Sequence, residues 1–344
     1  MKRKNAAIRY LPVILLLIFL LTGCTASGPA QSLPAERTTF AMDTLMELKA
    51  YCGDDVLDRC VERIAELEKI FSVTDPESEI YSLNDTGTSV LGNDASILLK
   101  EALSLCERTG GALDISIYPV VRAWGFTTGE YRIPAKEELA ELRKRVDYSK
   151  VEMNGSSVSI PDGMMIDLGS VAKGYCSDCL AEMLKEAGVK SALLNLGGNI
   201  YALGTKPDGT KWNIGIQDPN GSGYLGVLKA SDLAVITSGG YERYFEENGK
   251  VYWHIMDPAT GEPASSGLIS VSVIGSRGVV CDGLSTALFV MGLDRAAQMW
   301  RDSEDFEAVF VTDTGSIYIT EGLKDDFHTA GAYASEEIQV ITHE

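Results

Sequence analysis

Apolar and polar residues alternate in short runs along most of the chain, and longer runs repeat with helical periodicity. Residues 38–52 alternate with a period of two, which predicts a strand, and residues 56–71 place apolar side chains every three or four positions, which predicts an amphipathic helix. By the same criteria we expect further strands at 156–160, 164–168, 191–196, 211–217, 233–237 and 268–274, and helices at 96–109, 134–145 and 282–291. Because these elements interleave without a regular βαβ repeat, the pattern predicts an α+β fold with mixed sheets and packed helices.

The first residues differ in composition from the rest of the chain. A basic start precedes an apolar run at 11–21 that is shorter than the roughly 20 residues of a membrane span, and Leu21-Thr22-Gly23-Cys24 follows. This segment resembles the lipobox of bacterial lipoproteins, in which cleavage leaves a lipidated cysteine. We therefore expect a signal peptide at 1–23, a tether at 24–37 that starts at the lipidated Cys24, and one catalytic domain at 38–344. The alternative is an uncleaved N-terminal anchor with an accidental cysteine. Both place the protein on the extracytoplasmic face of the cell membrane.

The net charge restricts the classes of partner. The formal charge is −19 at pH 7, and removal of the basic start would make it more negative. Such an acidic protein repels nucleic acid, so we expect no nucleic-acid partner. A ligand that carries phosphate would need a local cation, which a lysine, a metal ion or a helix N-terminus can supply.

The cysteines after Cys24 allow a metal or redox interpretation at one place. They are Cys52, Cys60, Cys106, Cys176, Cys179 and Cys281, of which two form a C-x-x-C motif. There is no second C-x-x-C, and the chain has only three histidines. The motif also falls within a predicted helix, where cysteine is usually a small core residue. We favour the structural interpretation.

Residues 164–175 suggest an anion site. A predicted strand ends at Leu168, Gly169 and Ser170 form a turn, and the first turn of the following helix carries Lys173. Free N–H groups at a helix start beside a lysine suit a phosphate or pyrophosphate. The glycine spacing matches neither a Walker A loop nor a G-x-G-x-x-G fingerprint. Ordinary packing of a strand against a helix is the alternative.

Two further groups of residues could take part in chemistry. Asp282, Ser285 and Thr286 lie at i, i+3 and i+4 of a predicted helix, so their oxygens share one face and suit a hard cation such as Mg²⁺. The alternative is that Asp282 only caps this helix. His254 sits in a predicted apolar strand and is either a neutral-pH base or a structural histidine.

Five motifs in order, together with Met42-Asp43-Thr44, are similar to those of the FAD:protein FMN transferases, the ApbE family. The motifs are DLGSVAKGY at 167–175, NLGG at 195–198, TSGGYERY at 237–244, HIMDP at 254–258 and DGLSTALF at 282–289. The resemblance runs to about Gly292. It implies an α+β fold with FAD in a central cleft, and a Mg²⁺-dependent enzyme that cleaves FAD, attaches FMN through a phosphoester bond to Thr or Ser of a target protein, and releases AMP.

The resemblance also implies roles for individual residues. FAD contacts are implied for Met42, Thr74, Ala112, Leu113, Asp114, Asp167, Lys173 and Met256. Mg²⁺ ligands are implied for Asp282, Ser285, Thr286 and the backbone oxygen of Ser170, and His254 corresponds to the active-site histidine. The target protein would be exported or membrane-bound, such as a subunit of a membrane redox complex.

The chain departs from the family pattern at three positions. Asp43 replaces the usual glycine, Gly240 replaces a more commonly polar residue, and Ser170 replaces a small apolar one. The first two leave open an FAD pyrophosphatase that yields AMP and FMN. A further alternative is an exported FAD-binding lipoprotein without turnover, and the weakest takes 282–286 as a flavin acceptor segment.

Replacement of Cys24 tests the predicted lipid anchor. We expect Cys24→Ala to abolish lipid attachment and to leave an unprocessed or mislocalised precursor, because the lipid would be carried by this thiol. Fractionation of cells and mass spectrometry of the N-terminus measure both effects. Normal processing and membrane retention in the variant would contradict the assignment.

Overall fold

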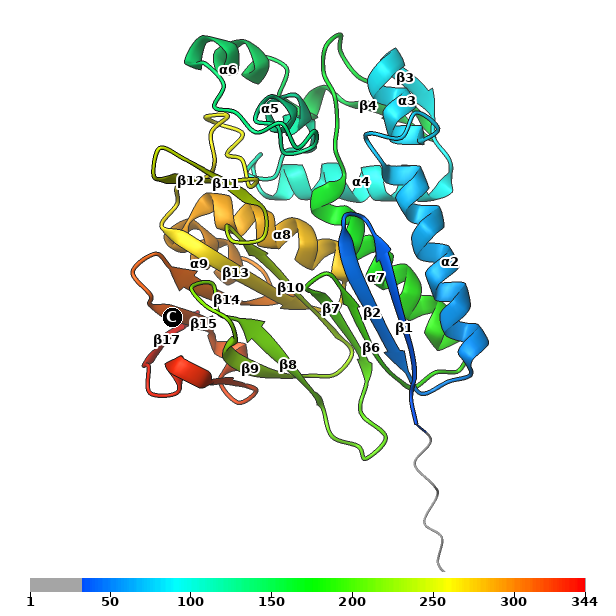
Figure 1. Cartoon of the computed structure of the whole chain (residues 1–344), viewed down its shortest axis with the longest axis vertical. Coiled ribbons are helices and arrows are strands. Elements are labelled where there is room, and N and C mark those ends of the chain that lie inside the picture. The colour runs from blue at the N-terminus through cyan, green and yellow to red at the C-terminus, as the bar shows by residue number, and fades with distance from the viewer. Residues whose placement is uncertain (1–32, 344) are drawn as a thin grey trace, which may run out of the picture. The chain divides into compact units, whose positions relative to one another are not determined.

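The computed structural model describes residues 33–343, and residues 34–344 form one compact unit. Its centre is a nine-stranded sheet with strand order β1-β2-β6-β7-β10-β13-β14-β15-β17 (Figure 1). All neighbouring strands are antiparallel except β15 and β17. The strands are β1 (Ala35–Ala41), β2 (Thr44–Ala50), β6 (Ser191–Leu196), β7 (Asn199–Gly204), β10 (Leu233–Gly239), β13 (Leu268–Gly275), β14 (Phe306–Thr312), β15 (Ile317–Thr320) and β17 (Ile338–Ile341).

Helices cover one face of this sheet and a smaller sheet covers the other. The helices that pack on the sheet or on one another are α2 (Asp54–Phe71), α4 (Asn93–Arg108), α7 (Gly169–Glu186), α8 (Gly278–Met291) and α9 (Leu293–Arg301). The smaller sheet has the order β16-β9-β8, with β8 (Trp212–Gln217), β9 (Tyr224–Ala230) and β16 (Phe327–Thr329). Successive residues of a strand point to opposite faces, so Ala308 and Phe310 of β14 join the core under the helices while Val309 and Val311 join the core under β8 and β9.

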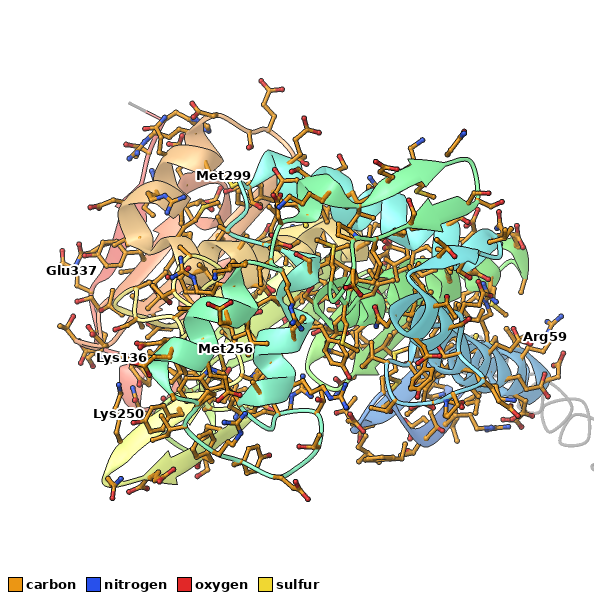
Figure 2. The ribbon with its side chains drawn as sticks, turned by 90° about the horizontal axis from the view of Figure 1, so that it is seen from above. Arg59, Lys136, Lys250, Met256, Met299 and Glu337 are labelled. Carbon is orange, nitrogen blue, oxygen red and sulfur yellow. The ribbon has the colours of Figure 1, made fainter. Side chains whose placement is uncertain are left out.

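The remaining elements lie beyond the end of the large sheet that carries the β1–β2 turn (Figure 1). They are α3 (Glu79–Thr86), α5 (Tyr118–Ala123), α6 (Lys136–Arg143), β3 (Thr88–Val90), β4 (Glu152–Asn154), β5 (Ser157–Ser159), β11 (Tyr244–Glu247) and β12 (Lys250–Trp253). Short 3₁₀ turns occupy Ile115–Ile117, Tyr148–Lys150, Glu321–Leu323 and Gly331–Tyr333. In Figure 2, Lys250 lies on the β11–β12 hairpin, far from Arg59 on α2. Within the described residues no helix has both the length and the apolar character needed to cross a membrane.

Helices α7 and α8 approach one another so closely that only glycine fits at their contact. A Cβ atom on Gly174 would overlap the carbonyl oxygen of Gly278 and would lie 2.7 Å from the Cβ of Asp282. A Cβ on Gly278 would lie 2.5 Å from the carbonyl oxygen of Gly174. This contact lets a side chain of α8 reach the backbone of α7.

The α+β class with mixed sheets is confirmed, but three predicted elements differ in the structure. The strand predicted at 38–52 is a hairpin, because Met42 and Asp43 have positive φ and turn the chain; its first strand begins at Ala35, inside the predicted tether. The predicted signal peptide and Cys24 lie outside the described residues. The helix predicted from Asp282 begins at Gly278, because both carboxylate oxygens of Asp178 accept the N–H groups that open it, from Gly278 at 2.6 Å and Val279 at 3.0 Å.

The strand predicted at 164–168 is the third difference, since this segment is extended but belongs to no sheet. The side chain of Asn84 takes the place of a neighbouring strand. Its oxygen accepts the N–H of Ile166 at 2.7 Å, and its nitrogen donates to the Ile166 carbonyl at 2.8 Å. The N–H of Asp167 donates to the carbonyl of Ile115 at 2.8 Å. These bonds satisfy the backbone that precedes α7.

Gly174→Ala tests the close contact of α7 and α8. The added methyl group must push the helices apart, and overpacking of this kind costs about 1–3 kcal/mol of the free energy of unfolding. Chemical denaturation measures the loss. Glu182→Ala, on an exposed position of the same helix, is the control and should stay within about 0.5 kcal/mol of the parent. Equal stability of Gly174→Ala and the parent would contradict the tight contact.

Candidate functional site

A cleft of about 430 Å³ opens where the large sheet, the starts of α7 and α8, and the segment after β12 meet. The structure brings most of the sequence-predicted residues together in its lining. These are Met42, Ala112, Leu113, Asp114, Asp167, Ser170, Lys173, His254, Met256, Asp282 and Thr286. The residues come from segments far apart in the sequence, so the fold assembles the site. Thr74 and Ser285 do not line this cleft.

Asp282 joins the two helices at the base of the cleft. Its carboxylate oxygen accepts the N–H of Gly174 at 2.8 Å, and burial raises the pKa of this carboxyl. Asp282 lies in the second turn of α8, so the alternative that it only caps the helix is wrong. In a regular helix the Gly174 N–H would serve the carbonyl of Ser170, four residues earlier. The Gly174 N–H therefore has an acceptor outside its own helix, and Ser170 itself lines the cleft.

The three residues predicted on one face of α8 separate in the structure. Thr286 lines the cleft together with Asp282. Ser285 is fully buried, and its hydroxyl donates to the Asp282 carbonyl at 2.8 Å and bonds the hydroxyl of Ser238 on β10 at 2.8 Å. Ser238 also lies 3.3 Å from the Thr286 hydroxyl. Ser285 and Ser238 therefore support the position of Thr286.

The donors at this point suit a hard cation. A carboxylate (Asp282), a hydroxyl (Thr286) and a backbone carbonyl (Ser170) are oxygen donors, which Mg²⁺ prefers, with water completing its shell. In the described part of the chain no group of three or more His, Cys, Asp or Glu is arranged to hold a metal. The lining carries five carboxylates, of Asp43, Asp114, Asp167, Glu242 and Asp282, against the two cations Lys173 and Arg243. A phosphate ligand therefore needs a further positive charge here.

The predicted anion site at the start of α7 is partly occupied by the protein itself. The Asp167 carboxylate accepts the N–H of Gly169 at 2.8 Å, so this helix terminus already faces a negative group. Lys173 lies in the second turn of α7, not the first, because the helix begins at Gly169. Lys173 forms no ion pair with any described residue and lines the cleft, where it can contact a ligand.

The Asp114 carboxylate is engaged mainly in hydrogen bonds within the protein. One of its oxygens accepts the N–H and the hydroxyl of Ser116 at 2.8 and 2.6 Å, and the other accepts the N–H of Tyr148 at 3.2 Å. Burial raises the pKa of this carboxyl, and these hydrogen bonds oppose the shift. Asp114 thereby fixes the path of residues 112–115 along the cleft wall.

His254 is oriented by the backbone at the base of the β11–β12 hairpin. Its Nδ1 lies 3.2 Å from the carbonyl oxygen of Arg243, and its N–H donates to the same oxygen at 3.0 Å. If Nδ1 carries the proton that this contact calls for, Nε2 is left with a lone pair. Burial, and next the charge of Arg243, lower the pKa of His254 to about 3. The imidazole is therefore neutral near pH 7.

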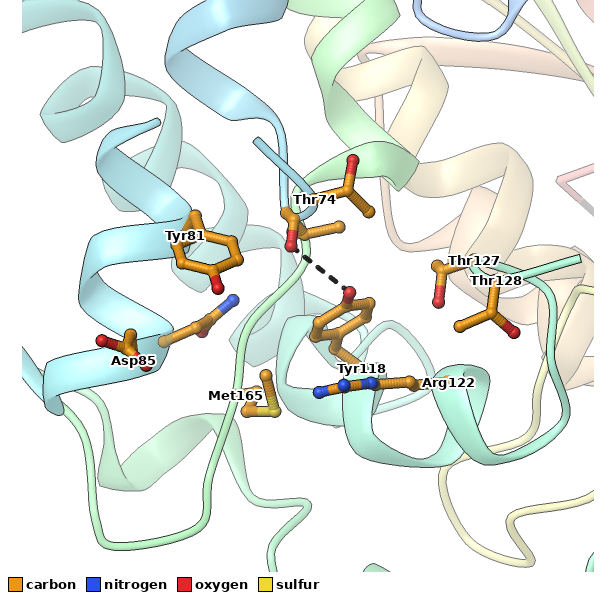
Figure 3. Close-up of a pocket in the computed structure, with 10 residues that line it drawn as sticks. Thr74, Tyr81, Asp85, Tyr118, Arg122, Thr127, Thr128 and Met165 are labelled. Atoms are coloured by element: carbon orange, nitrogen blue, oxygen red, sulfur yellow. Dashed lines mark hydrogen bonds between the residues drawn. The ribbon is translucent and has the colours of Figure 1, made fainter. Parts of the chain in front are cut away.

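Thr74 lines a second pocket, of about 440 Å³, to which Thr127 also belongs (Figure 3). Thr127 belongs to both linings, so the pocket adjoins the main cleft. Figure 3 shows Tyr81, Tyr118 and Arg122 around it. Tyr118 donates to the carbonyl of Val73 at 3.5 Å, which is a weak contact.

Ser238, Glu242 and Arg243 of the 237–244 motif also line the cleft, although the sequence predicted no role for them. Burial raises the pKa of Glu242 to about 7, although Lys173 lowers it. The motif itself was the available signal, since it places one polar side chain at the end of a buried strand and two more directly after it. Spacing alone could not show that this strand ends beside α8.

The C-x-x-C motif lies inside α7, as the structural interpretation requires. Cys176 is fully buried and Cys179 partly buried, and burial raises the pKa of both thiols. The six cysteines of the described residues are all free thiols.

The fold and the cleft define a protein of the flavin-transferase class. Comparisons with known proteins agree with this class. Residues 42–310 match the ApbE family, and the chain belongs to that family. Among curated relatives, the FAD:protein FMN transferase of Treponema pallidum is 31% identical over 328 residues, covering 88% of this chain and 91% of that protein. The enzyme of the same name from Vibrio cholerae is 32% identical over 298 residues, covering 82% and 88%.

Solved structures show the same architecture. The ApbE protein of Thermotoga maritima has a TM-score of 0.81 and 30% identity, and the match covers 85% of this chain and 99% of that one. A mutant of the flavin transferase ApbE from Vibrio cholerae has a TM-score of 0.76 and 28% identity, with 86% and 100% covered.

Because the pKa of His254 is low, we expect this residue to lower the free energy of unfolding as the pH falls. An unfolded histidine binds a proton below its ordinary pKa of 6.5, whereas folded His254 stays neutral until about 3. Lowering the pH through this window therefore favours the unfolded chain, and stability is lost as the pH falls. We expect the melting temperature of His254→Gln to fall less than that of the parent between about pH 7 and about pH 5.

Thermal unfolding without FAD or metal measures this difference. His328→Gln, at an exposed position, is the control and should follow the parent. An identical pH dependence in the parent and His254→Gln would show that the folded protein does not hold this imidazole neutral.

Proposed function

We propose that this chain is a Mg²⁺-dependent FAD:protein FMN transferase. The observation that carries the proposal is the convergence of the Asp282 carboxylate, the Thr286 hydroxyl and the Ser170 carbonyl beside Lys173 and His254 in one cleft. The names of the relatives support the same activity. A carrier that only stored FAD would have no need of a cation site at the pyrophosphate.

Lys173 would stabilise the negative charge of the pyrophosphate, together with a Mg²⁺ ion held by the three oxygen donors. Phosphoryl transfer needs positioning and charge stabilisation more than covalent chemistry from the protein. Asp282, Thr286 and the Ser170 carbonyl would hold Mg²⁺, which when bound neutralises the pyrophosphate oxygens and their developing charge. Lys173 would contact a phosphate oxygen from the second turn of α7.

His254 would take the proton of the acceptor. Its Nε2 accepts the proton of a Thr or Ser hydroxyl, and the hydroxyl oxygen forms a bond to the phosphorus of the FMN half. The bond from that phosphorus to the bridging oxygen breaks, and AMP leaves with this oxygen. A negatively charged substrate close to the imidazole raises its pKa again, which improves it as a base.

We further propose that one ring system of FAD reaches the second pocket. Thr74 corresponds to a FAD contact of the family and lines this pocket, whereas the other FAD-contacting positions line the main cleft. An FAD molecule that touches both must pass Thr127. The ring of Tyr81, which lines this pocket and is only partly buried, then offers apolar surface to a planar group.

The location and the partner are also proposals. The basic start, the short apolar run and Cys24 support a lipid anchor on the extracytoplasmic face. The acceptor would then be an exported or membrane protein that presents Thr or Ser.

Asp282→Asn separates the metal role from the structural role of this residue. The amide can still accept the Gly174 N–H but has no negative charge, so the fold should persist while Mg²⁺ binds poorly. We expect the melting temperature to stay close to that of the parent and AMP release to fall by about a hundredfold, as for the loss of a charged contact worth roughly 3 kcal/mol. Titration of AMP release against Mg²⁺, with FAD and an acceptor protein, measures the effect.

The same assay tests the function as a whole. Flavin that becomes covalently attached to the acceptor supports transfer, and free FMN in its place would identify a pyrophosphatase. Asp294→Asn, an exposed position on α9, controls for the change of charge. Normal Mg²⁺ dependence of Asp282→Asn would refute the metal site.

A further inference from the structure

Two tight turns lie side by side at the edge of the cleft. Met42 and Asp43 join β1 to β2, Gly197 and Gly198 join β6 to β7, and β2 is hydrogen-bonded to β6. All four residues have positive φ and line the cleft. Positive φ at both residues is the geometry of a two-residue type I′ hairpin.

The two turns differ in how well their residues suit this geometry. Glycine adopts positive φ without a steric penalty. Met42 at φ 50° and Asp43 at φ 60° place side chains where L-residues are unfavourable. Asp can compensate with local hydrogen bonds of its own side chain, but methionine has no such group. A turn that keeps methionine here needs support from outside the turn.

Glu68 supplies that support from α2. Its carboxylate accepts the backbone N–H of Met42 at 2.5 Å, and this is a charge-assisted hydrogen bond. Glu68 is half-buried and does not line the cleft itself. On the other side, the side chain of Thr44 fills the space where a Cβ of Gly197 would lie. The turn is thus held between α2 and the neighbouring turn.

We propose that Glu68 is a positioning residue for FAD binding, which fixes Met42 in the unfavourable conformation that presents its side chain to the cleft. Backbone strain persists at functional sites only where the surroundings impose it, and Glu68 is the group that imposes it here. This inference rests on the proposed function, because it takes Met42 as a contact of FAD.

Glu68→Ala tests the inference. Without the carboxylate, the turn should leave the left-handed conformation for part of the time. We expect FAD to bind about tenfold more weakly, as for the loss of one charge-assisted hydrogen bond. KM for FAD should rise while kcat at saturating FAD stays unchanged. Amide hydrogen exchange of residues 40–46 in the ligand-free protein should become faster.

Two further variants separate positioning from general destabilisation. Glu62→Ala removes a charge from an exposed position of the same helix and should leave FAD affinity unchanged. Asp43→Gly added to Glu68→Ala places a residue suited to positive φ at the second position of the same two-residue turn. The turn as a whole then needs less support from Glu68, so most of the affinity should return. If Glu68→Ala does not fold, Glu68→Gln, which keeps a weaker neutral acceptor, takes its place with a smaller expected loss and the same rescue.

The outcomes distinguish this inference from the proposed function. A parent protein that binds no FAD overturns the proposed function and, with it, the role of Met42. A parent that binds FAD while Glu68→Ala binds equally well overturns only the role of Glu68. A loss of affinity that Asp43→Gly does not restore also overturns it, since the loss would not arise from strain in the turn.

Discussion

The contact between α7 and α8 is the constraint on which the rest of the site depends. Only because Gly174 and Gly278 lack side chains can the two helices approach closely enough for the Asp282 carboxylate to accept a backbone N–H of α7. Asp282 of α8 and Ser170 of α7 both line the cleft. The helix–helix contact thus sets the spacing of two of the three oxygen donors that we assign to the cation, whereas Ser238 of β10 lies beside the third, Thr286.

The cleft is lined by five carboxylates and only two cations, so it repels a dianionic ligand unless a further positive charge binds with that ligand. Asp167 and Asp114 are tied into turns by backbone N–H groups, so their charges are partly satisfied within the protein. Asp282 accepts one backbone N–H with one oxygen and lines the cleft. Under the proposed function, the excess negative charge would favour a phosphate group that arrives together with a metal ion.

Local patterns in the sequence predicted the α+β class, most of the central strands, and the shared face of Asp282 and Thr286. What they could not predict was set by partners distant in the chain. The start of α8 at Gly278 depends on Asp178, about a hundred residues earlier, and the extended segment before α7 depends on Asn84. The turn at Met42 lacks an Asn-Gly or Gly-Gly signal, and its backbone N–H is bound by Glu68, which lies 26 residues later in the sequence. The family motifs located the cleft, but not the second pocket beyond Thr127.

The two ends of the β11–β12 hairpin are joined at its base. The carbonyl of Arg243 accepts two hydrogen bonds from His254, one from the backbone N–H and one from the ring. The imidazole is therefore oriented by the residue that directly precedes β11, and it also lies against the ring of Phe126. Insertions and deletions at the tip of the hairpin, around Asn248 and Gly249, leave these contacts in place. The outer surface of the hairpin can therefore vary without a change in the contacts that orient His254.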